Sequence, residues 1–316
     1  MNRRKLTFLF LGGAKRVVVG RMFLEACRRR DIDGAIVAYE LDSHSAIASI
    51  GTVVEGLPWR DPQVYADIDR VVDSYGVDVV VPFVDPAVGV AAEYRRRVGG
   101  AVFVPTGDAA PSAAMFDKVA AAEIFERKNI PVPPTYRAGD PCRQLIAKPR
   151  FGSASKGIIA IDTLQSLYQV QAMGDRYLIQ ERIDNREELS VDCYASVADG
   201  TITACSPRLR CEVSGGEAVR TETVADTGAA ALAADVIAKT GLRGAVTVQL
   251  IRDLDTGRLM VMEVNPRLGG AVVGSVHAGV DIPGMIVDDA LGIPPSAATA
   301  KPGVETVRYL EDIVFQ

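Results

Sequence analysis

Strands and helices alternate along the first hundred residues, and this alternation constrains the fold more than any other feature. Apolar runs of strand length lie at 6–11, 34–39, 77–82 and 101–104. Helical segments lie between them at 17–30, 62–75 and 86–97. Strands that alternate with helices form a parallel sheet with helices on both faces. The sequence therefore predicts an α/β domain at the N-terminus.

The loop Gly12-Gly13-Ala14-Lys15-Arg16 joins the first strand to the first helix. Backbone N–H groups at such a helix start can receive an anion. The loop lacks the GxGxxG pattern of a dinucleotide site. A plain βα turn and a small-anion site therefore stand as equal alternatives.

The pattern of predicted secondary structure changes after Pro105. We expect one helix over 111–128, a proline-rich linker at 130–134, and short strands with tight loops to about Asp226. A helix over 228–240, a β-hairpin, a helix at 283–291 and a strand at 305–309 follow. This part of the chain reads as α+β.

The hairpin carries oxygen ligands. Two apolar strands, 246–251 and 259–264, flank a polar turn, and Glu263-Val264-Asn265-Pro266-Arg267 ends the second one. Side chains alternate along a strand, so Glu263 and Asn265 share a face. A carboxylate and an amide oxygen suit Mg²⁺ bound to phosphate. Arg267 could then meet a phosphoryl group, although a solvated arginine after a turn is nearly as good an interpretation.

A loop rich in small residues joins two further strands. Strand 145–149 contains Lys148, and the loop runs from Phe151 to Gly157 with Gly152, Ser153 and Ser155 in it. No helix follows the loop, so it is not a Walker P-loop. Such a loop can fold over a triphosphate as a lid, with Lys148 as a fixed charge beneath it. A flexible hairpin and a surface lysine are the alternatives.

The strand at 177–183 precedes an acidic turn. Its backbone could pair with the edge of an adenine, and Glu188 could accept hydrogen bonds from ribose hydroxyls. Each of these signals is weak alone, and their order along the chain carries the argument.

That ordered set resembles the ATP-grasp superfamily, and most closely the branch similar to the carbamoyl phosphate synthase large subunit. The residues that carry the resemblance are Lys118, Lys148 with its loop, Gln180-Glu181-x-Ile183, Glu188, Gln249, Glu263, Asn265 and Arg267. The resemblance implies a Rossmann-like pre-ATP-grasp domain at 1–110 and an ATP-grasp domain of two α+β lobes at 111–316. The lid would lie at about 133–178.

The resemblance also implies roles for these residues. Lys118 and Lys148 would contact the α- and β-phosphates of ATP, Glu181 and Ile183 the adenine, and Glu188 the ribose. Glu263 and Asn265 would hold Mg²⁺, or Mn²⁺ in its place, with Gln249 nearby. Arg267 would stabilise the transferred phosphoryl group. Arg208, Arg210 and Arg220 lie on the segment beside the acceptor site, and at least one of them would bind a carboxylate or phosphate unless all three are solvated.

The chain departs from the synthase in two ways. The synthase has a second arginine three residues after the position of Arg267, where this chain has Gly270. Gly269-Gly270 looks more like the ATP-grasp ligases that join a carboxylate to an amine. The chain also has one ATP-grasp unit where the synthase needs two phosphorylation steps. Both differences argue against carbamoyl phosphate synthesis.

We therefore expect an ADP-forming carboxylate–amine ligase that passes through an acyl phosphate. The alternatives are a carbamoyl phosphate synthase-like or kinase-like phosphotransferase and a nucleotide-binding regulatory module without turnover. No catalytic histidine is needed, since His44 and His277 fit capping or surface positions better. The partners expected are a small carboxylate and an amine, and a homodimer is compatible with the resemblance.

Composition excludes other classes of partner. The net charge of -5 gives no basic surface for nucleic acid, and the arginine runs at 28–30 and 95–97 each close a predicted helix. No stretch has the roughly 20 apolar residues of a membrane span. The basic N-terminus precedes an apolar run too short for a signal peptide. The cysteines (Cys27, Cys142, Cys193, Cys205, Cys211) include no CxxC pair, so we expect free thiols in a reducing cytoplasm.

Overall fold

A parallel sheet forms the N-terminal part of the molecule, as predicted. The computed structural model describes residues 4–140, 144–152 and 156–315. The strands of this sheet lie in the order β3-β2-β1-β4, all parallel. Their bounds are Arg4–Leu11 for β1, Ile32–Glu40 for β2, Thr52–Glu55 for β3 and Val79–Pro82 for β4. The sequence pattern missed the short β3.

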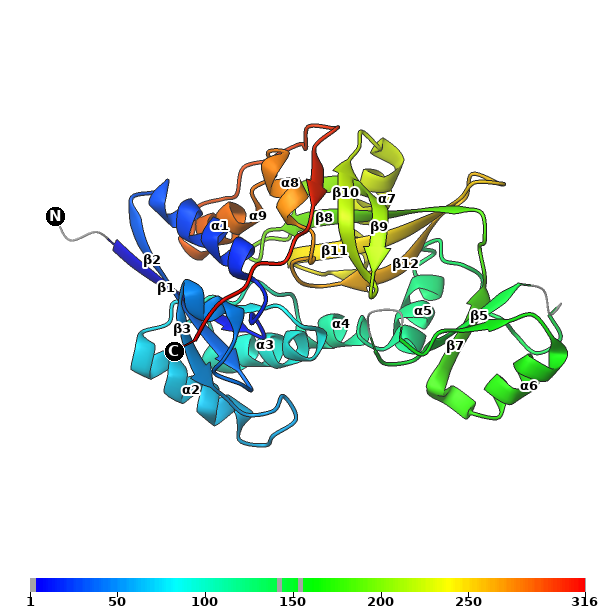
Figure 1. Cartoon of the computed structure of the whole chain (residues 1–316), viewed down its shortest axis with the longest axis horizontal. Helices are drawn as coiled ribbons and strands as arrows, with labels where there is room; N and C mark the ends of the chain where they lie inside the picture. The colour runs from blue at the N-terminus through cyan, green and yellow to red at the C-terminus, as the bar shows by residue number, and fades with distance from the viewer. Residues whose placement is uncertain (1–3, 141–143, 153–155, 316) are drawn as a thin grey trace.

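Helices cover both faces of this sheet (Figure 1). Helix α1 (Val17–Arg28) packs on one face around Phe8, Phe10 and Phe23, while α2 (Val64–Tyr75) and α3 (Asp85–Val98) pack on the other. The strand predicted at 101–104 is wrong, because only Phe103 makes a bridge to Val79. Pro105 follows directly and has no N–H to continue a ladder.

The helix predicted over 111–128 is two helices. α4 (Ala109–Ala114) ends before Asp117, and α5 (Lys118–Arg127) begins after it. The Asp117 side chain accepts hydrogen bonds from the N–H groups of Val119 and Ala120, so it is an N-cap. Arg150 binds the same carboxylate with 2.7 Å between nitrogen and oxygen. The break therefore fixes the start of α5 against Arg150, which directly follows strand β5 (Leu145–Pro149).

A small sheet with its own core forms the outer lobe on the right of Figure 1. Its order is β6-β5-β7, all antiparallel, and α6 (Leu164–Gln171) packs beneath it. The strands are β5 (Leu145–Pro149), β6 (Ile159–Ile161) and β7 (Tyr177–Glu181). Leu145, Ala147, Ile161, Leu167 and Val170 form a separate apolar cluster. Of the loop between β5 and β6, Ser153 and Ser155 lie outside the described residues.

The central sheet has the order β12-β11-β8-β9-β10-β13, antiparallel throughout. Its strands are β8 (Arg186–Ala195), β9 (Ile202–Ser214), β10 (Glu217–Thr223), β11 (Gly244–Asp253), β12 (Leu259–Asn265) and β13 (Glu305–Val307). The expected hairpin of β11 and β12 is confirmed. The expectation of short strands before residue 226 is confirmed for β5 to β7 and wrong for β8 and β9, which have 10 and 13 residues.

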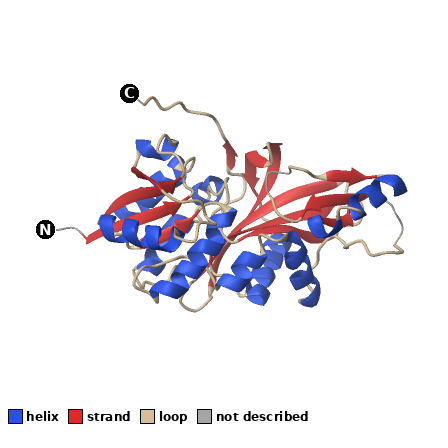
Figure 2. Cartoon of the chain, turned by 90° about the horizontal axis from the view of Figure 1, so that it is seen from below, coloured by secondary structure: helices blue, strands red, loops and turns tan. Residues whose placement is uncertain are grey.

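Helix α7 (Thr227–Thr240) covers one face of this sheet. It packs on Leu189, Val191 and Val248, and Gly241 ends it with a positive φ of 73°. The chain then returns through α8 (Val273–His277) and α9 (Ile282–Ala290) to the parallel sheet. Figure 2 shows the helices on the parallel sheet and on the central sheet from below.

The returning segment shares a core with the first domain. Leu268, Val272 and Ile286 lie in the same buried cluster as Phe8 and Phe10. Arg30 of the first domain binds Asp288 at 2.5 Å, and Arg29 binds Asp281. The arginine run at 28–30 is therefore used for packing between domains as well as for closing α1. The division at residue 110 stays a prediction.

Within the described ranges, no helix is long and apolar enough to cross a membrane.

Candidate active site

A cleft of about 460 Å³ lies between the parallel sheet, the central sheet and the outer lobe. It brings together most of the predicted site residues: Lys118, Lys148, Gly152, Glu181, Ile183, Glu188, Arg208, Arg210, Gln249, Glu263, Asn265 and Arg267. Arg220 and Gly157 do not line it. Ser153 and Ser155 lie outside the described residues.

The face of the central sheet that borders the cleft is polar. Alternate residues of β8, Glu188, Ser190 and Asp192, point to this face, while Leu189 and Val191 point to α7. Gln249 lies opposite Ser190 on one side and Glu263 on the other. Strand pairing thus places side chains from separate strands in one row across the sheet.

Two lysines lie where the outer lobe meets this row. Lys148 donates a hydrogen bond of 3.0 Å to Gln180 Oε1, and Gln180 in turn donates to the Pro133 carbonyl. Burial lowers the pKa of Lys148 to about 8, against the opposing effect of Glu263. Lys118 Nζ donates to the Gly152 carbonyl at 2.7 Å. Lys118 is therefore held against the loop between β5 and β6. Lys148 lies on β5, the strand that leads into this loop.

The predicted metal ligands Gln249, Glu263 and Asn265 all line the cleft. Glu263 is buried enough that its pKa is raised, with Lys118 the largest opposing influence. Asn265 Oδ1 accepts a hydrogen bond of 3.2 Å from Arg267. The described residues contain no group of three His, Cys, Asp or Glu side chains that could hold a metal. One carboxylate with two amide oxygens fits Mg²⁺ that also binds phosphate, and it does not fit a metal held by protein alone.

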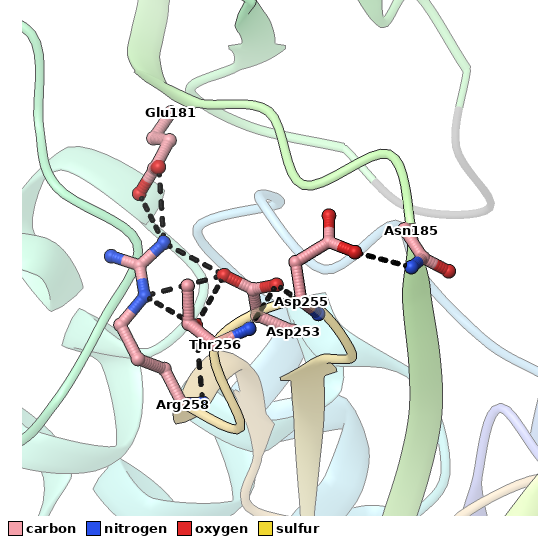
Figure 3. A network of polar contacts seen from close by, with 6 residues as sticks. All are labelled: Glu181, Asn185, Asp253, Asp255, Thr256 and Arg258. Carbon is pink, nitrogen blue, oxygen red and sulfur yellow. Dashed lines mark hydrogen bonds and ion pairs between the residues drawn. The ribbon is translucent and has the colours of Figure 1, made fainter.

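Glu181 and Ile183 border the other end of the cleft. Arg258 donates to both carboxylate oxygens of Glu181 at 3.0 Å and also contacts Asp253 (Figure 3). In the same figure Asn185 donates to Asp255 at 2.6 Å. These bonds attach the end of β7 to the turn between β11 and β12.

The Glu181 carboxylate is therefore occupied. The backbone N–H of Glu181 donates to the Pro134 carbonyl. Ile183 belongs to a small apolar cluster with Ile251 and Met260. A flat apolar ring could lie against such a surface.

Glu188 lies further along the same strand face and is paired with arginines. It accepts from Arg186 at 2.9 Å and lies 3.4 Å from Arg210 Nε. That Arg210 Nε makes no hydrogen bond to a described residue. Burial lowers the pKa of Arg210.

The other two arginines of the β9–β10 segment have different surroundings. Arg208 forms a buried ion pair with Asp192 at 2.7 Å, and its Nη1 makes no hydrogen bond within the described residues. Asp192 also accepts from Thr247 and Ser275. Arg220 lies outside the cleft and pairs with Glu305 at the surface. Of the acceptor-side arginines predicted, the structure brings Arg208 and Arg210 to the cleft and leaves Arg220 outside it.

Arg267 connects the two domains across the cleft. Its Nε lies 2.5 Å from Asp85 Oδ1 at the start of α3, and both side chains are mostly buried. Asp85 was not among the predicted site residues. The Asp-Pro pair at a helix start could have indicated it, since Pro86 stands at the first turn of α3.

Sequence reasoning also missed three charged residues at the end of the cleft beyond Arg267. They are Arg16, Glu217 and Arg308. The sequence suggests an anion site in the loop from Gly12 to Arg16 only through its backbone N–H groups. The structure shows those of Gly13 and Ala14 next to the Glu40 carboxylate, whose pKa burial raises to about 7 despite these hydrogen bonds. The loop contributes to the cleft through the Arg16 side chain instead.

Comparison with sequence families gives one match. A family described as "ATP-grasp in the biosynthetic pathway with Ter operon" matches residues 174–313, which is less than half of the chain. No curated protein sequence matches the chain.

Solved structures match over nearly the whole chain at low identity. An N5-carboxyaminoimidazole ribonucleotide synthetase with ADP has a TM-score of 0.74 and 14% identity, over 95% of this chain and 81% of that one. The biotin carboxylase domain of a 2-oxoglutarate carboxylase from Hydrogenobacter thermophilus, with MgADP, ADP and bicarbonate, has 0.72 and 16%, over 93% and 71%. An L-amino acid ligase from Bacillus licheniformis has 0.71 and 15%, over 92% and 75%. At these identities the likeness establishes the fold.

Proposed function

We propose that this chain, which has the ATP-grasp fold, belongs to the ATP-grasp superfamily and is an ATP-dependent ligase. It would activate a carboxylate as an acyl phosphate and pass the acyl group to an amine, with release of ADP. The closer kinship to the carbamoyl phosphate synthase branch stays a prediction.

One observation carries this proposal. A single cleft holds two lysines, the Glu263 and Asn265 oxygens, and the Arg267 guanidinium. These are the groups that a triphosphate, its Mg²⁺ and a transferring phosphoryl group would need, in that order. The solved structures with ADP and MgADP support ATP and Mg²⁺ as the ligands.

The residues of the chain act mainly by position and charge. Lys118 and Lys148 would hold the α- and β-phosphates, and Glu263, Asn265 and Gln249 would face the metal. Bound Mg²⁺ would neutralise charge on the phosphate oxygens. Arg267, held by Asp85, would point at the γ-phosphoryl group, where charge develops during transfer.

The chemistry has two steps. A carboxylate oxygen of the acceptor attacks the γ-phosphorus, and the bond from that phosphorus to the oxygen shared with the β-phosphate breaks, so ADP leaves. The amine nitrogen then attacks the acyl carbon. The bond from that carbon to the phosphate oxygen breaks, inorganic phosphate leaves, and the amine loses a proton to phosphate or water.

Two other functions remain open to the same site. A phosphotransferase would stop at the phosphorylated product. A regulatory module would bind ATP and not turn it over, yet such a module has no need of Glu263, Asn265 and Arg267 together.

Hydroxylamine trapping separates these functions. The protein is incubated with Mg-ATP, hydroxylamine and a panel of carboxylates, and both ADP and hydroxamate are measured. A ligase gives the two products in equal amounts, since hydroxylamine replaces the amine. ADP without hydroxamate indicates another phosphotransfer, and ATP binding without ADP for any acceptor indicates the regulatory module.

The variant Glu263→Gln links the result to the metal site. Removal of the anionic ligand should weaken Mg²⁺-dependent ATP binding and turnover, and excess Mg²⁺ should restore part of both. Glu212→Gln, at an exposed position of β9, is the matched control. Equal activity of both variants would reject the metal assignment.

A further inference from the structure

Charged side chains from three distant segments meet at the end of the cleft beyond Arg267. Arg16 precedes α1, Glu217 begins β10, and Arg308 follows β13. A Cβ atom built on Gly270 would lie 3.2 Å from both Arg16 Nη1 and Arg308 Nη2, and 3.8 Å from Glu217 Oε2. The three side chains therefore surround one glycine.

Arg308 and the nearby Arg267 already have partners. Arg308 binds Glu217, and it donates to the Gly270 carbonyl at 2.5 Å. Arg267 binds Asp85. The Arg16 guanidinium forms no hydrogen bond or ion pair with any described residue, and it does not cap α1.

Arg16 has no partner among the described residues, and the positive charges of Arg267 and Arg308 lie near it. Burial lowers its pKa, and the nearby Arg267 lowers it further. A partly buried cation without a partner is costly unless a ligand supplies an anion. One carboxylate of a ligand would give Arg16 that partner.

The Glu217 carboxylate narrows the chemistry of the ligand further. It can accept a hydrogen bond from a cationic group of the ligand as well as from Arg308. A simple amine would leave Arg16 without a partner. A zwitterion satisfies both signs, because a carboxylate can accept hydrogen bonds from more than one donor at a time.

Small and apolar residues contribute to the lining of the cleft. They include Phe83, Val84, Ala218 and Ala271, and Gly269 and Gly270 line it without side chains. A Cβ added to Gly269 would lie 2.7 Å from Thr247 Oγ1, so a glycine is needed there.

We propose that this end of the cleft binds an α-amino acid, with its carboxylate on Arg16 and its ammonium group on Glu217. The proposal rests on the proposed function, because the carboxylate held by Arg16 is the one that ATP would phosphorylate. Arg308 is a positioning residue that holds Glu217. Beyond Arg308 the chain continues to Phe315, whose ring lies 5.2 Å from that of His44 in the segment after β2.

Binding of matched compounds tests the proposal without turnover. Each of the twenty common L-amino acids is compared with its carboxamide and with its des-amino acid, by calorimetry on the full chain saturated with a Mg²⁺ complex of a non-hydrolysable ATP analogue. We expect at least one amino acid to bind, and its two analogues to bind at least tenfold more weakly.

The variant Arg16→Met should weaken binding of that amino acid about 10- to 150-fold, as loss of a charged hydrogen bond does. Arg28→Met, on the exposed side of α1, is the matched control and should change nothing. Glu217→Gln should reduce the preference for the amino acid over its des-amino acid at least tenfold, which loss of fold would not do. Affinity for the ATP analogue should stay the same in all three variants.

The outcomes distinguish this proposal from the ligase itself. If only carboxylates without an amino group bind and yield hydroxamate, and Arg16→Met has no effect, the ligase stands and the amino-acid site is rejected. If an amino acid binds through Arg16 but no carboxylate yields ADP, the site stands and the ligase is rejected. If no amino acid binds, the amino-acid site is rejected.

Discussion

At the scale of single residues, burial changes what the charged groups of the cleft can do. Lys148 is buried beside Gln180, and its pKa is lowered to about 8. Phosphate oxygens attract the charged ammonium form and not the neutral amine. Nucleotide affinity should therefore depend on pH within an ordinary working range.

We expect the dissociation constant of Mg-ATP to rise as pH increases from 7 to 9, approaching tenfold per pH unit above pH 8. The folded pKa is lowered, so the charged form is complete only well below pH 8 and is lost above it. Lys148→Met should bind about 1.5–3 kcal/mol more weakly and lose this dependence. Calorimetry at several pH values measures both, with Lys239→Met on α7 as control. A constant affinity in the parent protein would contradict the assignment of Lys148.

Arg267 should separate binding from chemistry. Arg267→Met should leave Mg-ATP affinity within about threefold and lower kcat by about 10² to 10³, as loss of one transition-state donor does. Single-turnover ADP formation measures the effect. Because Asp85 loses its partner, the double variant Asp85→Asn with Arg267→Met controls for the unpaired carboxylate. Turnover at the parental rate would remove Arg267 from phosphoryl transfer.

At the scale of elements, local patterns predicted much and tertiary contacts decided the rest. The ends of α1, α2 and α7 follow from apolar periodicity and from Gly76 and Gly241, both with positive φ at a helix end. The alternation of polar and apolar residues in β8 contained the information for a long strand. Asp192 in the middle of this strand is a residue type that is depleted in strands, and only its buried ion pair with Arg208 in the folded chain accounts for it there.

Some features had no local signal. Asp117 divides a run of good helix formers, and its role as a cap depends on Arg150 from another lobe. Arg16 and Arg308 meet at Gly270 only after the chain has folded. Lys148, Glu263 and Arg267 could be predicted from the sequence because each lies in a motif of a few residues. Glu217 lies in no such motif.

The polar face of the central sheet should be sensitive to loss of Asp192. Asp192→Ala leaves the buried Arg208 charge without its partner and should lower the free energy of unfolding by about 3–5 kcal/mol. Urea denaturation measures this, and adding Arg208→Met should recover part of the loss. Asp199→Ala, in an exposed turn, is the control. A loss below about 1 kcal/mol would mean that the ion pair contributes little.

At the scale of the whole molecule, two cores differ in extent. One cluster joins β1 and α1 to α9, and another is confined to the outer lobe. The parallel sheet and the segment that contains α9 should therefore unfold together. The outer lobe should unfold separately. The closed lobe would cover nucleotide, so its independence bears on function.

Two core variants test this difference. Ile286→Ala should lower the free energy of opening of the amides in β1 and in β11 by a similar amount, about 2–5 kcal/mol. Leu167→Ala should lower it in β5 and β7 and leave β1 unchanged. Native-state hydrogen exchange resolves the two patterns. Unchanged protection of β1 in Ile286→Ala would show that the shared core is not one cooperative unit.

The shared core also has a consequence for synthesis of the chain. Strand β1 is made long before the residues that complete its core, which extend from Leu268 to Val287. At about 5–20 residues per second, the ribosome needs roughly 15 to 55 s to deliver them. During that interval Phe8, Phe10 and Phe23 lack part of their cover. The nascent chain thus presents an apolar surface for a time long enough for chaperones to bind it.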